Sequence, residues 1–387
     1  MNTPGNLPLL RSANQMAIVR AVRASPAISR AALATYVGLT KAGVGQLVES
    51  LIKDGWLAEQ QAPTASARGR PSIPVILAGQ RFAFLGVSVN EKGNRVFATT
   101  LGGEVIDSLA QIIPNLEVKA ALSALALQIS ILHERLVAQG FKVFGVGVGA
   151  PGPVNVESGV LHYSDRAGWQ DAAIRELLCI ELAALKLSKL AVVVERGVGC
   201  IALHQFELKR TTAEEPLLYL QIGHSFAAAI AGRAGLSRGS RGLAGTVSHL
   251  QVVPDGAPCP CGRNGCANVT VTLQAIERSL GTKISGVEEI DITPAEVRAA
   301  VDQTGALLGL FIRNLCLAYD PARVFVGGPA PLVCPRLIEA AQETLDQLCS
   351  PQNMPTPSLE MIRSDNRDAV ARGAAVALID SVLGGRV

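Results

Sequence analysis

Residues 143–154 read VFGVGVGAPGPV, and the first part of this stretch, Val143–Gly149, is one of the short β-rich runs that follow residue 81. The other strong runs are Phe82–Val89, Ala191–Glu195, Leu217–Ile222 and Val324–Gly327. Longer helical segments alternate with these runs. Strands and helices that alternate in this way predict an α/β fold.

Two of the helical segments are well defined by the sequence. One covers Val118–Gln139, and a second is expected to start at Thr293. At that start, Thr293, Pro294 and Glu296 match a capping box with proline at the first helical position.

The composition is that of an ordered globular protein. The 387 residues correspond to two or three domains of about 100 to 200 residues each. Hydrophobic residues make up 49% of the chain and charged residues 17%, which excludes disordered and fibrous proteins. Met1–Leu10 lacks the apolar core of a signal peptide, and no uncharged apolar run reaches the ~18 residues of a membrane span. We therefore expect a cytoplasmic protein without a membrane segment.

Positive charge is concentrated at the N-terminus. Residues 1–80 contain eight Lys and Arg against three Asp and Glu, whereas the whole chain has a formal net charge of only +3. The rest of the chain is therefore slightly acidic. A small basic head on a faintly acidic body is expected when only the head binds a polyanion.

Three helices are predicted in this basic head. The first spans Asn14–Ser25. Ser29 can cap a second helix that runs through Val37, and Thr40 can cap a third, because both side chains can accept a hydrogen bond from a free backbone N–H. A glycine turn joins the second and third helices, which predicts a helix-turn-helix.

The head also carries the residues expected to contact DNA. The N-terminal turn of the third helix would face the major groove. Trp56–Gln60 and Ile73–Leu77 are predicted to form the strands of a wing, whose loop arginines suit a narrow minor groove. The alternative is a generic helical bundle with a flexible linker. The candidate DNA contacts are Ser29, Arg30, Thr40, Lys41, Gly43, Gln46, Arg68 and Arg70.

Three of the eight cysteines cluster with a histidine in the second half of the chain. His249, Cys259, Cys261 and Cys266 have the spacing H-x9-C-x-C-x4-C. Three thiolates and one imidazole complete the tetrahedral shell of a structural Zn²⁺ site, which leaves no position for a catalytic water. The alternative is a set of free or disulfide-linked cysteines, which a reducing compartment disfavours.

Several stretches together resemble the ROK family, which joins bacterial sugar kinases with sugar-responsive repressors. The stretches that carry the resemblance are Ser29–Leu39, Arg68–Pro71, Gly145–Val154, Gly242–His249, Cys259–Cys266 and Gly327–Pro329. The resemblance implies an actin-like, hexokinase-like ATPase fold of two lobes, a ligand cleft between them, and zinc on the cysteine motif. It also implies a homodimer or a dimer of dimers.

The domain organisation expected from this resemblance has three parts. Residues 1–80 form the winged helix-turn-helix domain, and residues 81–205 form the first lobe. Residues 206–387 form the second lobe with the zinc motif, and its C-terminal helix returns to the first lobe.

The chain departs from the family pattern where the kinases do their chemistry. The resemblance aligns the family's Asn-Asp pair, which supplies the catalytic base, with Arg196 and Gly197. The two phosphate-binding turns align with Ser88–Lys92, which has no glycine where the family has Asp-x-Gly-Gly-Thr, and with Gly223–Ala227, which has one glycine where the family's turn is Gly-rich. A general base is worth about 10²- to 10⁴-fold in rate, so we expect no catalytic residues and no enzyme activity. An active ROK sugar kinase is the alternative.

The sugar-binding positions implied by the resemblance are also altered, and only the histidine is retained. Two hypotheses follow: Arg196 with Lys92 binds an anionic effector such as a sugar acid or sugar phosphate, or Asp165 and Arg196 pair and fill the cleft. In a third interpretation, Arg196 only reaches solvent. The candidate effector-binding residues are Asp165, Arg196, Thr246, His249 and Asn268.

These observations predict a DNA-binding transcriptional regulator, a repressor, whose kinase-like body senses a sugar-type effector without catalysis. It would bind a palindromic double-stranded operator as a dimer. A regulator or scaffold controlled by a protein partner is the remaining alternative.

Overall fold

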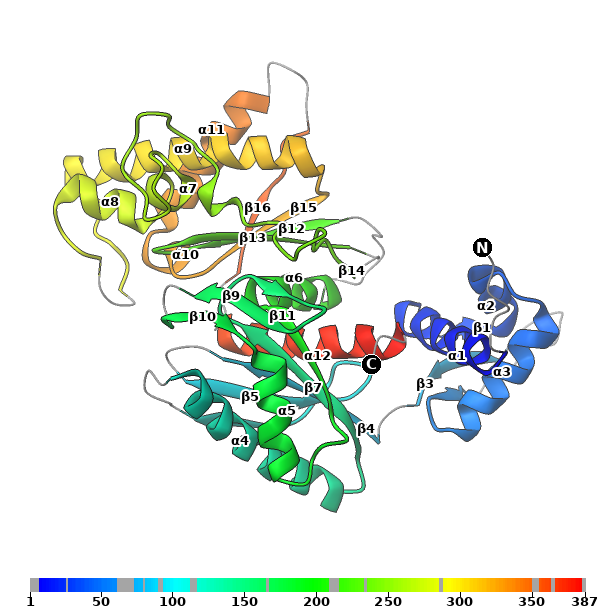
Figure 1. Cartoon of the computed structure of the whole chain (residues 1–387). Coiled ribbons are helices and arrows are strands. Elements are labelled where there is room, and N and C mark those ends of the chain that lie inside the picture. Colours follow the sequence, from blue (N-terminus) through cyan, green and yellow to red (C-terminus); the bar gives the residue numbers. More distant parts are fainter. Residues whose placement is uncertain are drawn as a thin grey trace. The chain divides into compact units, whose positions relative to one another are not determined.

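A computed structural model of the chain describes most of its residues (Figure 1). The described residues are 7–25, 27–60, 73–78, 81–89, 93–111, 117–164, 167–208, 216–232, 235–284, 288–349, 355–362 and 366–384.

The chain divides into two compact units. Unit 1 comprises Met1–Pro151, Val156–Glu195 and Ala374–Val387. Unit 2 comprises Gly152–Asn155 and Arg196–Gly373. The basic head belongs to unit 1, together with the last turns of the chain.

The head contains the three predicted helices and a small sheet. The helices are α1 (Leu7–Ala24), α2 (Arg30–Val37) and α3 (Lys41–Lys53). The strands β1 (Ile28–Ser29), β2 (Leu57–Glu59) and β3 (Pro74–Leu77) pair antiparallel in the order β1-β3-β2. The two wing strands are therefore confirmed, and α1 starts earlier than the predicted Asn14.

Helix caps explain why α2 and α3 begin where they do. The Ser29 hydroxyl accepts a hydrogen bond from the Ala32 N–H at 3.1 Å, and the Thr40 hydroxyl accepts one from the Gly43 N–H at 3.2 Å. Gly38 ends α2 with φ +68°, a left-handed conformation that favours glycine. Both caps were predicted from the sequence, and both are confirmed.

The rest of unit 1 is built on a five-stranded sheet in the order β11-β7-β4-β5-β6. β4 runs parallel to β7, and β4, β5 and β6 are consecutive antiparallel neighbours. The elements are β4 (Phe82–Ser88), β5 (Asn94–Thr99), β6 (Val105–Gln111), α4 (Val118–Ala138), β7 (Lys142–Ala150), β9 (Val160–Ser164), β10 (Trp169–Ala172), α5 (Ile174–Ala184) and β11 (Ala191–Arg196).

Unit 2 is built on a second five-stranded sheet, in the order β14-β13-β12-β15-β16. β12 is parallel to β15 and antiparallel to β13, so each unit combines parallel and antiparallel pairs. The elements are β8 (Val154–Asn155), α6 (Gly197–Leu208), β12 (Leu217–Ile222), β13 (Phe226–Gly232), β14 (Gly235–Leu236), a 3₁₀ turn (Val247–His249), α7 (Ala267–Thr270), α8 (Leu273–Leu280), α9 (Ala295–Tyr319), β15 (Arg323–Gly327), α10 (Ala330–Val333), α11 (Pro335–Cys349) and β16 (Leu359–Met361).

The last helix, α12 (Asn366–Leu383), is shared by the two units. It belongs to unit 2 up to Gly373 and to unit 1 from Ala374. Its middle is buried on all sides, with Ala374, Leu378 and Ile379 fully inaccessible to solvent.

The predicted capping box at Thr293 is wrong. The first helical residue of α9 is Ala295, and Pro294 occupies the N-cap position without any side-chain cap. The Thr293 N–H instead donates to the Asp291 carboxylate at 2.9 Å. The hydroxyl and the N–H of Thr293 together lower the pKa of Asp291. The threonine therefore closes a local turn ahead of the helix.

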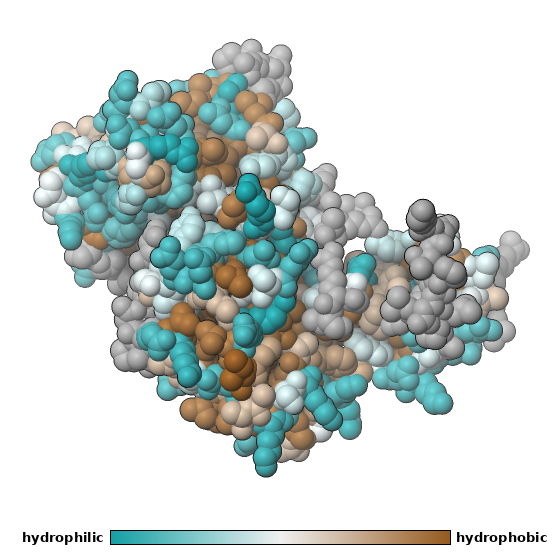
Figure 2. Space-filling model, viewed as in Figure 1, coloured by the Kyte–Doolittle hydropathy of each residue, from teal (hydrophilic) through white to brown (hydrophobic). Residues whose placement is uncertain are grey.

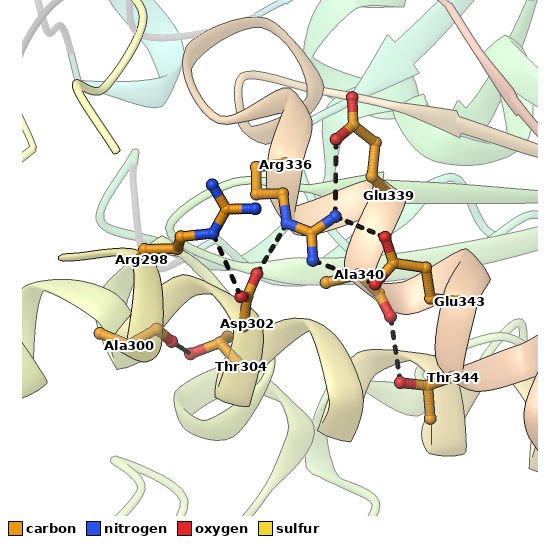
Figure 3. A network of polar contacts seen from close by, with 9 residues as sticks. All are labelled: Arg298, Ala300, Asp302, Thr304, Arg336, Glu339, Ala340, Glu343 and Thr344. Carbon is orange, nitrogen blue, oxygen red and sulfur yellow. Dashed lines mark hydrogen bonds and ion pairs between the residues drawn. The ribbon is translucent and has the colours of Figure 1, made fainter. Parts of the chain in front are cut away.

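Helices α9 and α11 pack closely, and a polar network joins them (Figure 3). Arg336 of α11 donates to Asp302 of α9 at 2.7 Å and to Glu343 at 2.5 and 3.0 Å. Gly305 and Gly309 of α9 face Ala340 and Ala341 of α11, so the helices meet where no side chain separates them.

Among the described residues, α4 alone is long and apolar enough to cross a membrane, by length and composition only. Its most apolar window is 44% buried. Leu127 and Ile131 of α4 and Ile180 of α5 are exposed. Figure 2 shows apolar surface where Figure 1 draws these two helices.

Candidate DNA-reading face, metal centre and ligand positions

The first turn of α3 presents polar side chains on the surface of the head. Lys41 and Gln46 are exposed, whereas Val44, Val48 and Leu51 of the same helix are fully buried in the core of the head. The buried stripe fixes the rotation of the helix, so the polar side points outward. An exposed N-terminal turn of this kind can contact base edges and phosphates.

Arg30 links three elements of the head through ion pairs. Its guanidinium donates to the Glu59 carboxylate at 2.9 Å and lies 3.6 Å from that of Glu49. It therefore joins α2 to β2 and α3, and any contact with a phosphate would compete with these two acids. The predicted contacts Arg68 and Arg70 lie outside the described residues.

Two arginines of the head form hydrogen bonds at a distance from α3. Arg23 is only 3% exposed and donates to the Leu101 carbonyl at 3.1 Å and to Asp380 of α12 at 3.4 Å. Arg20 donates to the Leu383 carbonyl at 2.6 Å. In the sequence, both arginines contribute only to the positive charge that is expected to face a polyanion. No local pattern reveals partners more than 350 positions away.

The four predicted metal ligands lie together at one point of unit 2. Their ligand atoms all lie within 4.8 Å of one another. Cys259 Sγ is 3.6 Å from His249 Nδ1, and Cys261 Sγ is 3.6 Å from Cys266 Sγ. Ligands about 2.3 Å from a tetrahedral Zn²⁺ would be separated by about 3.8 Å. The geometry therefore fits a metal ion, and the sulfur separation is too long for a disulfide.

Backbone hydrogen bonds shape the loop that carries these ligands. The Gly265 carbonyl accepts from the N–H groups of Val252 and Val253 at 2.7 and 3.2 Å, and the Cys259 N–H donates to Arg263 at 2.8 Å. Gly265 has φ +65°, and a Cβ at this position would collide with the Val253 carbonyl. Glycine is therefore required at Gly265 to bring Cys266 back to His249.

The cysteine thiols differ in their readiness to ionise before a cation arrives. The Arg263 backbone N–H lowers the pKa of Cys261, which lies at the surface. Burial, followed by hydrogen bonds from the neighbouring thiols, raises the pKa of Cys266 to about 12. A bound divalent cation would remove this difference, because metal ligation deprotonates thiols.

Arg196 is buried at the end of β11, with 8% of its surface exposed. It donates to the Thr246 hydroxyl at 3.2 Å and to the Ala228 carbonyl. The interpretation in which Arg196 only reaches solvent is therefore wrong. Its proposed partners Asp165 and Lys92 lie outside the described residues, so both other hypotheses remain predictions.

The structure brings some of the other ligand positions together within unit 2. Thr246 precedes the 3₁₀ turn that ends at His249. The Asn268 carboxamide accepts a hydrogen bond from the Phe226 N–H at 3.1 Å, which ties α7 to the start of β13. Gly197, which the sequence resemblance predicts at the position of the family's base, is the first residue of α6 and has no side chain that could accept a proton.

Comparison with known proteins gives the same fold. The ROK family profile matches residues 100–381. A xylose repressor from Caldicellulosiruptor bescii is 23% identical, with 98% of each chain covered. The DNA-binding transcriptional dual regulator NagC of Escherichia coli is 22% identical over 98% of this chain and 96% of its own. A glucokinase from Halalkalibacterium halodurans is 24% identical over 63% of this chain and 79% of its own.

Solved structures of regulators and of kinases also match different shares of this chain. A ROK family transcriptional regulator, a homolog of the E. coli MLC protein, superposes with a TM-score of 0.77 at 21% identity and covers 97% of this chain and 98% of its own. A ROK hexokinase from Thermus thermophilus gives a TM-score of 0.64 at 23% identity, over 76% of this chain and 97% of its own. The solved regulator matches nearly the whole chain, whereas the solved hexokinase leaves about a quarter of it unmatched.

Proposed function

Because the chain belongs to the ROK family, we propose that it is a DNA-binding transcriptional regulator, a repressor, whose kinase-like body senses a sugar-type effector. The observation that carries this proposal is the head, a helix-turn-helix with two wing strands and an exposed first turn on α3. The similar regulators match nearly the whole length of this chain, whereas the similar hexokinase matches only part of it.

In this proposal α3 reads the major groove. Lys41 contacts a phosphate, Gln46 contacts a base edge, and Thr40 fixes the start of the helix by its cap. The head acts as one of a pair in a homodimer, because helix-turn-helix proteins read palindromic operators with two-fold symmetry. Arg68 and Arg70 reach the minor groove from the wing loop.

The test is binding to duplexes that the wild-type protein selects from a randomised pool, measured by fluorescence anisotropy over a range of salt concentrations. Gln46→Ala should weaken binding to the selected duplex about tenfold and relax preference at one base pair. Lys41→Ala should weaken binding to all duplexes and reduce the salt slope by about 1.

Lys53→Ala is the matched control, because Lys53 is an exposed lysine in the last turn of the same helix. It should leave affinity and salt slope nearly unchanged. Wild-type protein that selects no duplex at low ionic strength would overturn the proposed function.

We propose Zn²⁺ for the metal centre. His249, Cys259, Cys261 and Cys266 would hold it as a closed tetrahedral site. With all four positions taken by protein ligands, the metal would supply structural stability and no chemistry. It would fix the loop that begins immediately after Thr246, one of the proposed effector positions.

The proposed effector site contains Arg196, Thr246, His249 and Asn268, with Asp165 as a fifth candidate. A buried guanidinium favours an anionic ligand, such as a sugar acid or a sugar phosphate. We propose no phosphoryl transfer, because the family resemblance predicts Gly197 where the kinases carry their base, and glycine has no side chain that could accept a proton. The effector would act by binding one conformation of the regulator better than the other.

A further inference from the structure

The DNA-reading head has an apolar contact with the sheet of unit 1. Trp56 of the head packs against Phe82 and Phe144, with ring centroids 4.7 and 5.2 Å away. One continuous hydrophobic cluster contains head residues such as Ile18 and residues of α12 such as Leu383. The head therefore shares its core with the body of unit 1.

Two arginines of α1 fasten the same contact by polar bonds. Arg20 donates to the Leu383 carbonyl, in the last turn of α12, at 2.6 Å. Arg23 lies 3.4 Å from the Asp380 carboxylate, one turn earlier in α12, and donates to the Leu101 carbonyl at 3.1 Å. A cation at the C-terminal end of a helix is favoured by the carbonyls exposed there. Both arginines thus hold the end of one helix.

The middle of α12 lies in close backbone contact with its neighbours. A Cβ at Gly147 of β7 would collide with the Ala374 carbonyl, and a Cβ at Gly373 would collide with the Cys200 carbonyl of α6. Close packing of this kind transmits displacement, because protein interiors are not continuously deformable. The helix is therefore fixed to β7 in unit 1 and to α6 in unit 2.

From these contacts we propose that Arg20 and Arg23 are positioning residues for DNA recognition. They fasten the head to the end of α12, and α12 thereby determines the position of the head on unit 1. The proposal rests on the proposed DNA-binding function for its biological meaning. In a dimer with heads fixed in this way, only operators with a matching half-site spacing bind both heads. A change in unit 2 that shifts the start of α12 reaches the head through the same helix.

The first experiment needs no DNA and uses the contact around Trp56. The chain has two tryptophans, so a Trp169→Phe background leaves Trp56 as the single indole. Acrylamide quenching of its fluorescence then reports whether the head stays packed on unit 1. In Arg20→Gln/Arg23→Gln, the quenching constant should rise about twofold or more.

Two further variants separate positioning from loss of folding. Arg20→Gln/Asp380→Asn removes polar bonds without changing a buried side chain of the head, and it should also raise quenching. Arg23→Lys retains the positive charge and should restore part of the protection. The control is Arg135→Gln, an exposed arginine of α4 that pairs with Asp107 at 3.7 Å and should leave quenching unchanged.

The second experiment measures binding to the selected operator with its half-sites moved apart one base pair at a time. The wild type should prefer its best spacing about a hundredfold, because a misplaced second half-site loses the gain from simultaneous binding. Both double variants should reduce this preference to less than about tenfold, and Arg135→Gln should retain it.

Unchanged quenching and an unchanged spacing preference in both double variants would overturn the proposal. If the wild type binds no duplex, the proposed function fails, and the quenching experiment alone decides whether the arginines position the head.

Discussion

His204 of α6 shows how one partly buried side chain makes stability depend on pH. Burial, and secondarily the positive charge of Arg372, lowers the pKa of His204 to about 4. The unfolded chain keeps the ordinary value of 6.5, so between these values the unfolded state binds more protons. The contribution of neutral His204 to stability is therefore present above pH 6.5 and is lost as the pH falls toward 4.

His204→Gln should make unit 2 less sensitive to acid. The wild type should lose up to about 3 kcal/mol more than the variant between pH 7 and pH 4, since each pKa unit corresponds to about 1.4 kcal/mol. Urea unfolding of both proteins at several pH values measures this difference. Parallel pH curves for the two proteins would contradict the prediction.

Loss of one metal ligand should loosen the loop that the metal fixes. Protein purified without chelator is expected to contain one zinc ion per chain, and Cys261→Ser should bind it far more weakly. Hydrogen exchange should then increase around residues 245–270. Cys179→Ser, which changes an exposed cysteine outside the cluster, should behave as the wild type does. Metal analysis that finds no zinc in the wild-type protein would rule the site out.

Sequence spacing could predict the metal centre because its four ligands fall within eighteen residues of one another. It could not predict how Arg196 is held, since the Ala228 carbonyl and the Thr246 hydroxyl lie 32 and 50 positions away. The pair Arg23 and Asp380 is separated by 357 positions. Contacts of this range depend on tertiary packing, which local patterns do not encode.

At the scale of helices, replacing a glycine by alanine is expected to have opposite effects on the stability of α3 and of α9. At Gly45 the nearest atom to an added Cβ is the Arg30 guanidinium at 3.9 Å, so there is room for a methyl group. At Gly309 the added Cβ would collide with the Ala341 carbonyl of α11 and lie 2.8 Å from Thr344 Cβ. Helix propensity alone favours alanine at both positions.

Gly45→Ala should therefore stabilise α3 by up to ~1 kcal/mol, whereas Gly309→Ala should destabilise the α9–α11 pair by about 1 to 3 kcal/mol. Hydrogen exchange of the amides in each helix measures the two effects separately. Stabilisation at both positions would show that α9 and α11 can move apart to accept a methyl group.

Elements with a strong local signal could be predicted closely. Hydroxyl caps defined the starts of α2 and α3, and β12 has the predicted bounds. Strand β6 was not predicted, because it is largely exposed and lacks an apolar run. The capping box of α9 failed because Asp291 competes for Thr293. Local propensity therefore predicts the ends of a helix only where no neighbouring side chain offers the capping residue a better hydrogen-bond partner.

At the scale of the whole molecule, a regulator of this design must convert ligand binding into a change at the head. A ligand shifts an equilibrium only by its difference in affinity for two states. A catalytically competent body would consume the ligand and end the signal. The predicted absence of the kinase base at Gly197, the first residue of α6, is therefore compatible with sensing.

This leads to a prediction about catalysis. Wild-type protein incubated with ATP and a panel of neutral sugars, sugar acids and phosphosugars should show no sugar-dependent consumption of nucleotide. Gly197→Asp alone should not restore it: a base contributes about 10²- to 10⁴-fold, and the phosphate turns, which the family resemblance predicts to be altered, would still bind nucleotide poorly. A ROK glucokinase run in parallel controls the assay. Thermal shift with the same panel should detect binding of an anionic member, and saturable turnover with any sugar would contradict the sensing role.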